Sequence, residues 1–222
     1  MKIQVFYHIF CNEKTISVVK DQVTKIIFSG LYDVVDYIHC FVAGDQEIIN
    51  NVVAYLEKCG NKFKICDVSN TDTSYERFTL TKIGNYVQPD DKFLYIHTKG
   101  ITKSGEEESN SHDWRTFMEY NLIHNFKECI NKLDVFDTVG VNTERVPALH
   151  YSGNFWWCKA SYYTKLNPNV LNQNFWGSTY LAPEMYILSG NPKAFQLTRS
   201  TIKNHYKEPY PFNKYIDHVI NK

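Results

Sequence analysis

The first half of the chain alternates short apolar runs with amphipathic segments. Residues 2–10 (KIQVFYHIF) are apolar, β-branched and aromatic, and residues 15–32 carry apolar side chains at helical spacing. The same alternation continues with a strand pattern at 34–44, a helix pattern at 46–60 and a strand pattern at 62–69. Repeated β-α units of this kind predict an α/β fold with a mostly parallel central sheet, covered by helices on both faces.

Capping and turn residues support these boundaries. Asp45 can cap the helix at 46–60, and Gly60 can end it. A polar loop at 70–74 then leads to a predicted helix at 75–87, which Pro89 ends. Residues 92–100 (KFLYIHTKG) form the fourth predicted strand.

The second half is less regular. Residues 101–113 are polar and rich in Ser and Glu, which predicts a mobile loop able to act as a lid. The remaining elements, in order, are a long helix at 114–133, a strand at 137–142, an aromatic-rich segment at 150–166, a helix around 182–190 and a strand at 193–200. Because neither a repeat nor a linker interrupts this order, we predict one domain over 1–222, with a nucleotide-binding half (1–100) and a sugar and acceptor half (101–222).

Composition narrows the class of protein. The chain has 222 residues with 43% hydrophobic content, and its 24 basic and 24 acidic residues cancel, so no general field attracts nucleic acid. The start of the chain lacks signal-peptide features, and no apolar run approaches the roughly 20 residues of a transmembrane helix. We therefore expect a soluble cytoplasmic protein (host cytoplasm if viral). The six scattered cysteines lack CxxC spacing, which argues against a zinc finger.

The end of the fourth strand carries unusual chemistry. His97, Thr98 and Lys99 follow an apolar strand and precede Gly100. Ligands of parallel α/β sheets bind at the carboxyl ends of the strands, where a lysine can neutralise phosphate oxygens and a histidine can donate to them. Gly100 lets the backbone turn close to a ligand. The alternative is a solvated lysine beside a histidine that bonds to backbone.

A second candidate site lies in the sequence HYSGNFWW at 150–157. Its Ser152, Gly153 and Asn154 combine a flexible backbone with short hydrogen-bonding side chains, and aromatic residues follow directly. Sugars bind polar groups through their hydroxyls and flat aromatic faces through their C–H groups. Alternation along a strand predicts that one of Trp156 and Trp157 faces the core and the other the ligand.

Several of these stretches carry a family resemblance. YERFTL, FLYIHTKGI, DWRTFMEY, DTVGVN, HYSGNFWWCKASYYTKL and PEMYI occur in the order found in a group of GT-A-like glycosyltransferases from bacteria and large DNA viruses. The HTK and WR motifs also resemble the rhamnan synthesis protein F group, and the similarity covers residues 1–190. It implies a hexosyl- or deoxyhexosyltransferase that uses a nucleotide-sugar, with a UDP-sugar favoured, and a glycan or glycoprotein acceptor.

The resemblance implies roles for the donor side. Three consecutive residues at the end of the first strand would lie along the nucleotide base: His8, Ile9 and Phe10. Gly44 would leave room for the base, while Glu76 and Thr79 would face the ribose or the sugar. The alternative is that both residues have ordinary structural roles, Glu76 as a carboxylate in the first turn of a helix and Thr79 as a hydroxyl inside it. Such roles are at least as common as ligand binding.

The resemblance also bears on the diphosphate. Enzymes of this kind usually bind it through a metal on a DxD motif, but this chain has His97-Thr98-Lys99 at that place, so no metal cofactor is expected and Mn or Mg is a minor alternative. Arg115 could reach a phosphate or an acceptor carboxylate, and Trp114 beside it could contact the sugar or the acceptor. The alternative is that Trp114 packs the start of the helix against the core and Arg115 snorkels over its ring. His150 could bind a sugar hydroxyl or backbone, and a metal site of His97, His150 and His205 is a remote alternative.

Glycosyl transfer with inversion needs a base for the acceptor hydroxyl. Glu184 follows Pro183 at the start of a helix and is our candidate, with Asp113 and Glu144 as weaker ones. In a retaining reaction, Glu184 would instead bind a sugar hydroxyl. The main alternative is a catalytically inactive module that binds a nucleotide-sugar or a glycan. A hydrolase or phosphotransferase is less favoured, because the sequence contains no P-loop, GxSxG or HExxH motif.

Overall fold

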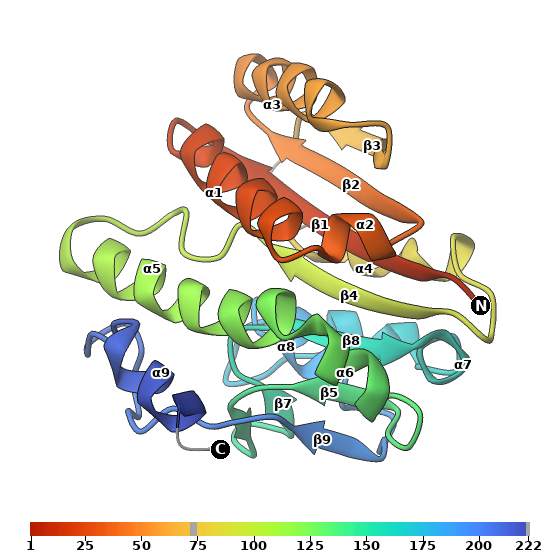
Figure 1. The fold of residues 1–222 in the computed structure, drawn as a ribbon, viewed down its shortest axis with the longest axis vertical. Helices are drawn as coiled ribbons and strands as arrows, with labels where there is room; N and C mark the ends of the chain where they lie inside the picture. The colour runs from red at the N-terminus through yellow and green to blue at the C-terminus, as the bar shows by residue number, and fades with distance from the viewer. Residues whose placement is uncertain (72–74, 221–222) are drawn as a thin grey trace.

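The computed structural model describes residues 1–71 and 75–220, so Asp72, Thr73 and Ser74 of the predicted polar loop lie outside the described residues. Its main sheet has the strand order β3-β2-β1-β4-β8-β5-β9 (Figure 1). These strands are β1 (Ile3–Cys11), β2 (Tyr37–Gly44), β3 (Phe63–Ser69), β4 (Lys92–His97), β5 (Thr138–Gly140), β8 (Trp156–Lys159) and β9 (Ala194–Gln196). A separate pair joins β6 (Thr143–Glu144) to β7 (His150–Tyr151).

The strand directions confirm the predicted fold class. β1 pairs in parallel with both β2 and β4, and β2 pairs in parallel with β3. β8 runs antiparallel between β4 and β5, while β9 is parallel to β5. The chain therefore reverses its lateral direction at β1 and β4, and the carboxyl ends of these two strands form a switch point of the kind where α/β sheets bind ligands.

Helices cover both faces of the sheet. The α-helices are α1 (Thr15–Phe28), α2 (Leu31–Val34), α3 (Gln46–Cys59), α4 (Arg77–Leu80), α5 (Gly105–Glu119), α6 (Phe126–Lys132), α7 (Ala160–Tyr163), α8 (Ala182–Tyr186) and α9 (Asn213–Ile220). In Figure 1, α1 and α5 lie in front of the sheet and α8 behind it. Each face buries its own apolar cluster, one that includes Val23 and Phe117 and one that includes Phe93 and Tyr163. Burial on both faces explains why the strands are apolar throughout.

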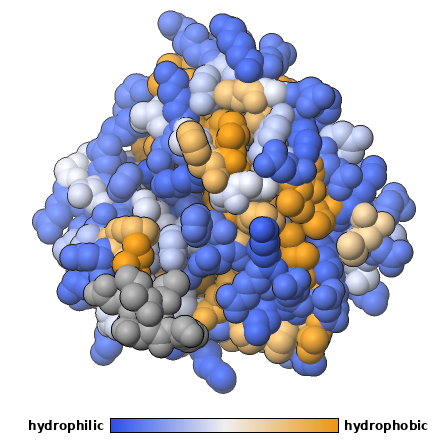
Figure 2. All heavy atoms as spheres, viewed as in Figure 1, coloured by the Kyte–Doolittle hydropathy of each residue, from blue (hydrophilic) through white to orange (hydrophobic). Residues whose placement is uncertain are grey.

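The outer surface follows the expected pattern. In the view of Figure 2 hydrophilic side chains cover most of the face, and apolar side chains appear between them near the centre. In the described part of the chain, no helix is both long and apolar enough to cross a membrane.

The capping signal of α3 is confirmed, whereas the long helix predicted just before β4 is not found. Asp45 Oδ1 accepts hydrogen bonds from the backbone N–H groups of Glu47 (2.9 Å) and Ile48 (3.1 Å), so the predicted cap is confirmed. The helix predicted at 75–87 is instead α4 followed by a short 3₁₀ turn at Ile83–Asn85.

The prediction of a mobile loop over 101–113 is wrong for most of its length. Helix α5 begins at Gly105, and its first turn contains three glutamates that favour a helix N-terminus. The long helix predicted at 114–133 is broken, because a π turn at Tyr120–His124 separates α5 from α6.

Candidate functional site

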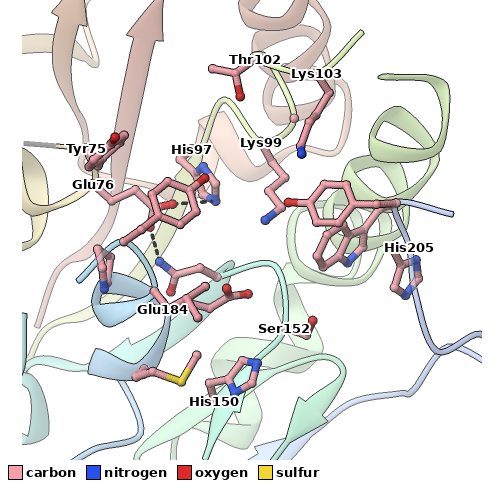
Figure 3. Close-up of a pocket in the computed structure, with 18 of the residues that line it drawn as sticks. Tyr75, Glu76, His97, Lys99, Thr102, Lys103, His150, Ser152, Glu184 and His205 are labelled. Atoms are coloured by element: carbon pink, nitrogen blue, oxygen red, sulfur yellow. Dashed lines mark hydrogen bonds and ion pairs between the residues drawn. The ribbon is translucent and has the colours of Figure 1, made fainter. Parts of the chain in front are cut away.

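A cavity of about 650 Å³ opens at the carboxyl ends of β1 and β4, at the switch point of the sheet. Twelve of the residues singled out from the sequence line it: His8, Phe10, Glu76, His97, Thr98, Lys99, Gly100, Trp114, His150, Ser152, Asn154 and Glu184. Figure 3 shows Lys99 and Lys103 on one side of the space, with Glu76, Tyr75 and Glu184 on the other. The two predicted candidate sites are therefore walls of one cavity.

The turn before β8 connects these walls. The Gly153 N–H donates to Glu184 Oε1 at 2.5 Å, and the Gly153 carbonyl accepts from His97 Nε2 at 3.1 Å. The Asn154 amide donates to Glu76 Oε2. Gly153 has φ +96, and a Cβ there would lie 2.4 Å from Met118 Sδ, so only glycine fits this position.

Glu76 lies at the base of the turn. Its Oε1 is 3.3 Å from His97 Nε2, and its side chain is only 20% exposed. Burial raises the pKa of Glu76 to about 7; the charge of Glu184 adds to the rise, while Lys99 and the Asn154 hydrogen bond oppose it. A carboxyl group with this pKa can hold or release a proton near neutral pH.

The histidines at the strand ends are held neutral. Burial lowers the pKa of His97 well below its ordinary value, with Lys99 adding to the effect, and burial lowers the pKa of His8 to about 3. Because both Gly153 O and Glu76 are acceptors, we assign the proton of His97 to Nε2. That N–H is directed at the turn, which differs from the predicted donation to a phosphate.

Lys99 is one of the lysines that line the cavity, with Lys103 and Lys203. Its Nζ lies 4.3 Å from the centre of the Trp114 ring and 5.6 Å from that of Tyr206, and it forms no ion pair with a carboxylate among residues 1–71 and 75–216, whose side chains the structure describes. Burial alone would lower the pKa of Lys99, but the nearby Tyr206, Glu184 and Glu76 outweigh burial and raise it above its ordinary value. The side chain therefore stays charged at physiological pH.

Two predicted residues, Arg115 and Thr98, fix the backbone at the end of β4, where Lys99 lies. Arg115 is 5% exposed and lies outside the cavity. Its Nη1 donates to the Lys99 carbonyl at 2.9 Å, and its Nε is 3.5 Å from Glu119 Oε1. Thr98 Oγ1 accepts from the Phe10 N–H at 3.0 Å, which ties the ends of β4 and β1 together. The guanidinium thus binds the backbone carbonyl of Lys99 from outside the cavity.

The prediction that one tryptophan of the aromatic segment faces the ligand is wrong. Trp156 and Trp157 are both 0% exposed. They do point to opposite faces of β8, but helices or loops cover both faces. Trp157 Nε1 donates to the Leu122 carbonyl and Trp156 Nε1 to Asn154 Oδ1, each at 2.8 Å. The second bond makes Trp156 a support for the turn.

Three residues predicted to contact the donor also lie outside the cavity. Ile9 is 0% exposed in the core, and Thr79 Oγ1 bonds His8 Nδ1 at 2.9 Å while itself fully buried. A Cβ on Gly44 would lie 2.4 Å from the Cys11 carbonyl oxygen, so this glycine permits the close approach of β1 and β2 and makes no room for a base.

Of the remaining predicted residues, one lines the cavity and two lie outside it. His150 lines the cavity, and its Nδ1 is 2.8 Å from the Ala148 carbonyl, which is the backbone option named above. Asp113 and Glu144 do not line the cavity, and Glu144 pairs with Arg199. In the described residues no three His, Cys, Asp or Glu side chains are grouped to hold a metal ion, so the His97, His150 and His205 site is not found.

Sequence reasoning missed part of the lining. These residues are Tyr75, Ile101, Thr102, Lys103, Val146, Pro147, Trp176, Tyr180, Leu181, Pro183, Met185, Lys203, Asn204, His205 and Tyr206. Of these, His205 was considered only as a metal ligand. The sequence did contain one signal for this part of the lining. Trp176 precedes Gly177 in a mainly polar stretch, and this context indicates an exposed tryptophan rather than a core residue.

Comparison with known proteins places the chain in a family. Residues 6–196 match the model of a family described as Domain of unknown function (DUF8361), and the chain belongs to this family. No curated protein matches the chain.

The chain is also similar to solved structures, at low identity. One is 4-diphosphocytidyl-2C-methyl-D-erythritol synthase from Anaerococcus prevotii DSM 20548 (11% identity, 98% of each chain, TM-score 0.46). Another is the galactosyltransferase LgtC in complex with donor and acceptor sugar analogs (10% identity, 87% of this chain and 72% of that chain, TM-score 0.44). A third is Rv0371c with manganese from Mycobacterium tuberculosis H37Rv (8% identity, 93% and 97%, TM-score 0.43).

The raised pKa of Glu76 predicts a pH-dependent stability difference between the wild type and Glu76→Gln. The folded state keeps a proton on Glu76 up to about pH 7, whereas the unfolded chain loses it near 4.5. Wild-type stability therefore falls as pH rises through this window, and the variant lacks this loss. Urea unfolding from pH 4 to 8 should show the variant gaining up to about 3 kcal/mol relative to the wild type by pH 7, then no further change.

The control variant is Glu57→Gln, which removes an exposed carboxyl group on α3 and is measured at the same pH values. The wild-type free energy of unfolding is subtracted from that of the variant at each pH. Because both proteins contain the same buried histidines, this difference reports mainly on Glu76. Parallel wild-type and Glu76→Gln curves would show that Glu76 titrates in its ordinary range.

Proposed function

We propose that this protein is a glycosyltransferase that moves a sugar from a nucleoside diphosphate sugar, with a UDP-sugar favoured, to a glycan or glycoprotein acceptor. The observation that carries the proposal is the Lys99 cation in a cavity at the sheet's switch point, where α/β folds bind nucleotides. The family resemblance of the HTKG and SGNFWW motifs supports it. The cavity volume of about 650 Å³ is in the range of small-molecule sites.

The diphosphate belongs at Lys99 in this account. A lysine acts as a compact point charge for phosphate oxygens, and the Lys99 ammonium lies 4.3 Å from the centre of the Trp114 ring, in a cation–π contact. Lys103 lines the same side of the cavity, where its Nζ lies 4.4 Å from the Tyr206 ring. Positive charge at this place stabilises the leaving diphosphate as negative charge develops on it. We accordingly propose that the reaction requires no bound metal.

Glu184 is the proposed base. It lines the cavity, and the Gly153 N–H fixes one of its carboxylate oxygens. In the proposed step the acceptor hydroxyl gives its proton to Glu184 while its oxygen bonds to the anomeric carbon. The bond from that carbon to the phosphate oxygen breaks, and its electron pair leaves on the diphosphate. The neighbouring Glu76 would bind sugar hydroxyls.

Donor binding should depend on Lys99. A ligand at a hundred times its Kd stabilises the folded state by about 2.7 kcal/mol, so thermal unfolding with UDP-, GDP- and dTDP-sugars should show an upward shift with one nucleotide class. Lys99→Ala should lose the shift, and EDTA should leave it unchanged. Lys127→Ala removes an exposed lysine whose Nζ lies 5.9 Å from the Phe126 ring, outside the cavity, and should keep the shift. A shift that persists in Lys99→Ala, or that EDTA removes, would contradict this assignment.

Glu184→Gln should separate catalysis from binding. If Glu184 is the base, turnover should fall about 10²- to 10⁴-fold while the donor-induced thermal shift remains. The measurement is release of nucleoside diphosphate in the presence of acceptor. Turnover close to the wild type in this variant would remove Glu184 from the base role. Donor binding without turnover in the wild type would favour an inactive nucleotide-sugar-binding module.

A further inference from the structure

Three exposed aromatic side chains stand at the rim of the cavity. Tyr75 is 48% exposed, Trp176 71% and Tyr180 58%, and all three line the cavity together with Glu76 and Glu184. The Tyr75 and Tyr180 rings lie 5.1 Å apart at 89° to each other. Exposed aromatic surface grouped beside polar groups in this way marks a binding surface more often than an unused one.

The backbone holds two of these rings in uncommon conformations. Tyr75 has φ +47 and Trp176 has φ +53, a region that bulky residues rarely adopt and that costs about 1–3 kcal/mol. Phe175 and Ser178 pair across a tight turn whose central residues, Trp176 and Gly177, both have positive φ. Asn, Asp or Gly normally occupies the first of these positions. The turn therefore displays a tryptophan where a small residue would be less strained.

The rim is fixed to the carboxylate side of the cavity. Tyr180 lies four residues before Glu184, and Tyr75 directly precedes Glu76. Arg77 joins the two segments, because its Nε donates to the Leu171 carbonyl at 2.6 Å and its Nη2 to the Thr179 carbonyl. Lys99 and Lys103 lie on the opposite side of the cavity (Figure 3).

We propose that Tyr75, Trp176 and Tyr180 form the acceptor subsite, where a pyranose ring stacks on the aromatic faces and directs a hydroxyl at Glu184. This assignment rests on the proposed function. The charge distribution favours a neutral sugar over the nucleotide here, because Glu76 and Glu184 repel a phosphate and accept hydrogen bonds from hydroxyls. A nucleobase of the donor stacked on the same rings is the competing occupant.

Trp176 reports directly on this subsite. The other three tryptophans, Trp114, Trp156 and Trp157, are at most 5% exposed, so acrylamide quenching of the protein's fluorescence acts mainly on Trp176. The probes are the methyl glycosides of glucose, galactose, N-acetylglucosamine and rhamnose at millimolar concentration, each compared with UDP. At least one methyl glycoside should lower the quenching constant about twofold or more, and UDP alone should not. Protection by UDP alone, or by no methyl glycoside, would overturn the assignment.

Two variants make the test specific. Tyr180→Ala keeps the reporter and should lose the protection by the methyl glycoside, whereas its UDP-induced thermal shift should remain. Phe28→Ala removes an aromatic ring that is 86% exposed at the end of α1, outside the cavity, and should keep both. Protection that survives in Tyr180→Ala would contradict the subsite. If a methyl glycoside protects Trp176 but no nucleotide binds in a Lys99-dependent way, the three aromatic residues form a sugar-binding site and the proposed transferase function is refuted.

Discussion

The hydrogen-bonded turn of Ser152, Gly153 and Asn154 is the contact on which the cavity depends. Its backbone and side chains bind His97 from β4, Glu76 from the segment before α4 and Glu184 from α8. These elements are far apart in sequence, and this turn brings their side chains together. These hydrogen bonds hold both Glu76 and Glu184 on one turn, where the charge of Glu184 adds to the rise in the pKa of Glu76.

Charge balance across the cavity follows from this arrangement. Burial lowers the pKa of Lys99, but the nearby Tyr206 and the carboxylates of Glu184 and Glu76 across the cavity outweigh it and raise the pKa. Lys99 in turn limits the rise in the pKa of Glu76. Arg115 is charged but lies beneath, where it fixes the Lys99 carbonyl. The cavity therefore has a cationic end suited to a diphosphate and an acidic, aromatic end suited to hydroxyl groups. This division underlies both the proposed reaction and the proposed acceptor subsite.

Sequence alone was sufficient where the signal was local. The Asp45 cap, the alternation of strands and helices, and the position of Lys99 at a strand end all depend on neighbouring residues and were predicted. The orientations of Trp156, Trp157 and Arg115 depend on which distant elements cover them, and here sequence reasoning failed. Tyr75 and Trp176 were missed for a similar reason, since their exposure results from backbone conformations with positive φ that single-residue patterns do not indicate.

The most direct test of the central claim compares nucleoside diphosphates with their parent nucleosides by titration calorimetry. If the Lys99 side of the cavity binds the diphosphate, one of UDP, GDP and dTDP should bind at least tenfold more tightly than its nucleoside, and added salt should reduce the difference, because salt screens the charge on which it depends. Equal affinity of nucleoside and diphosphate, or binding of neither, would contradict the account.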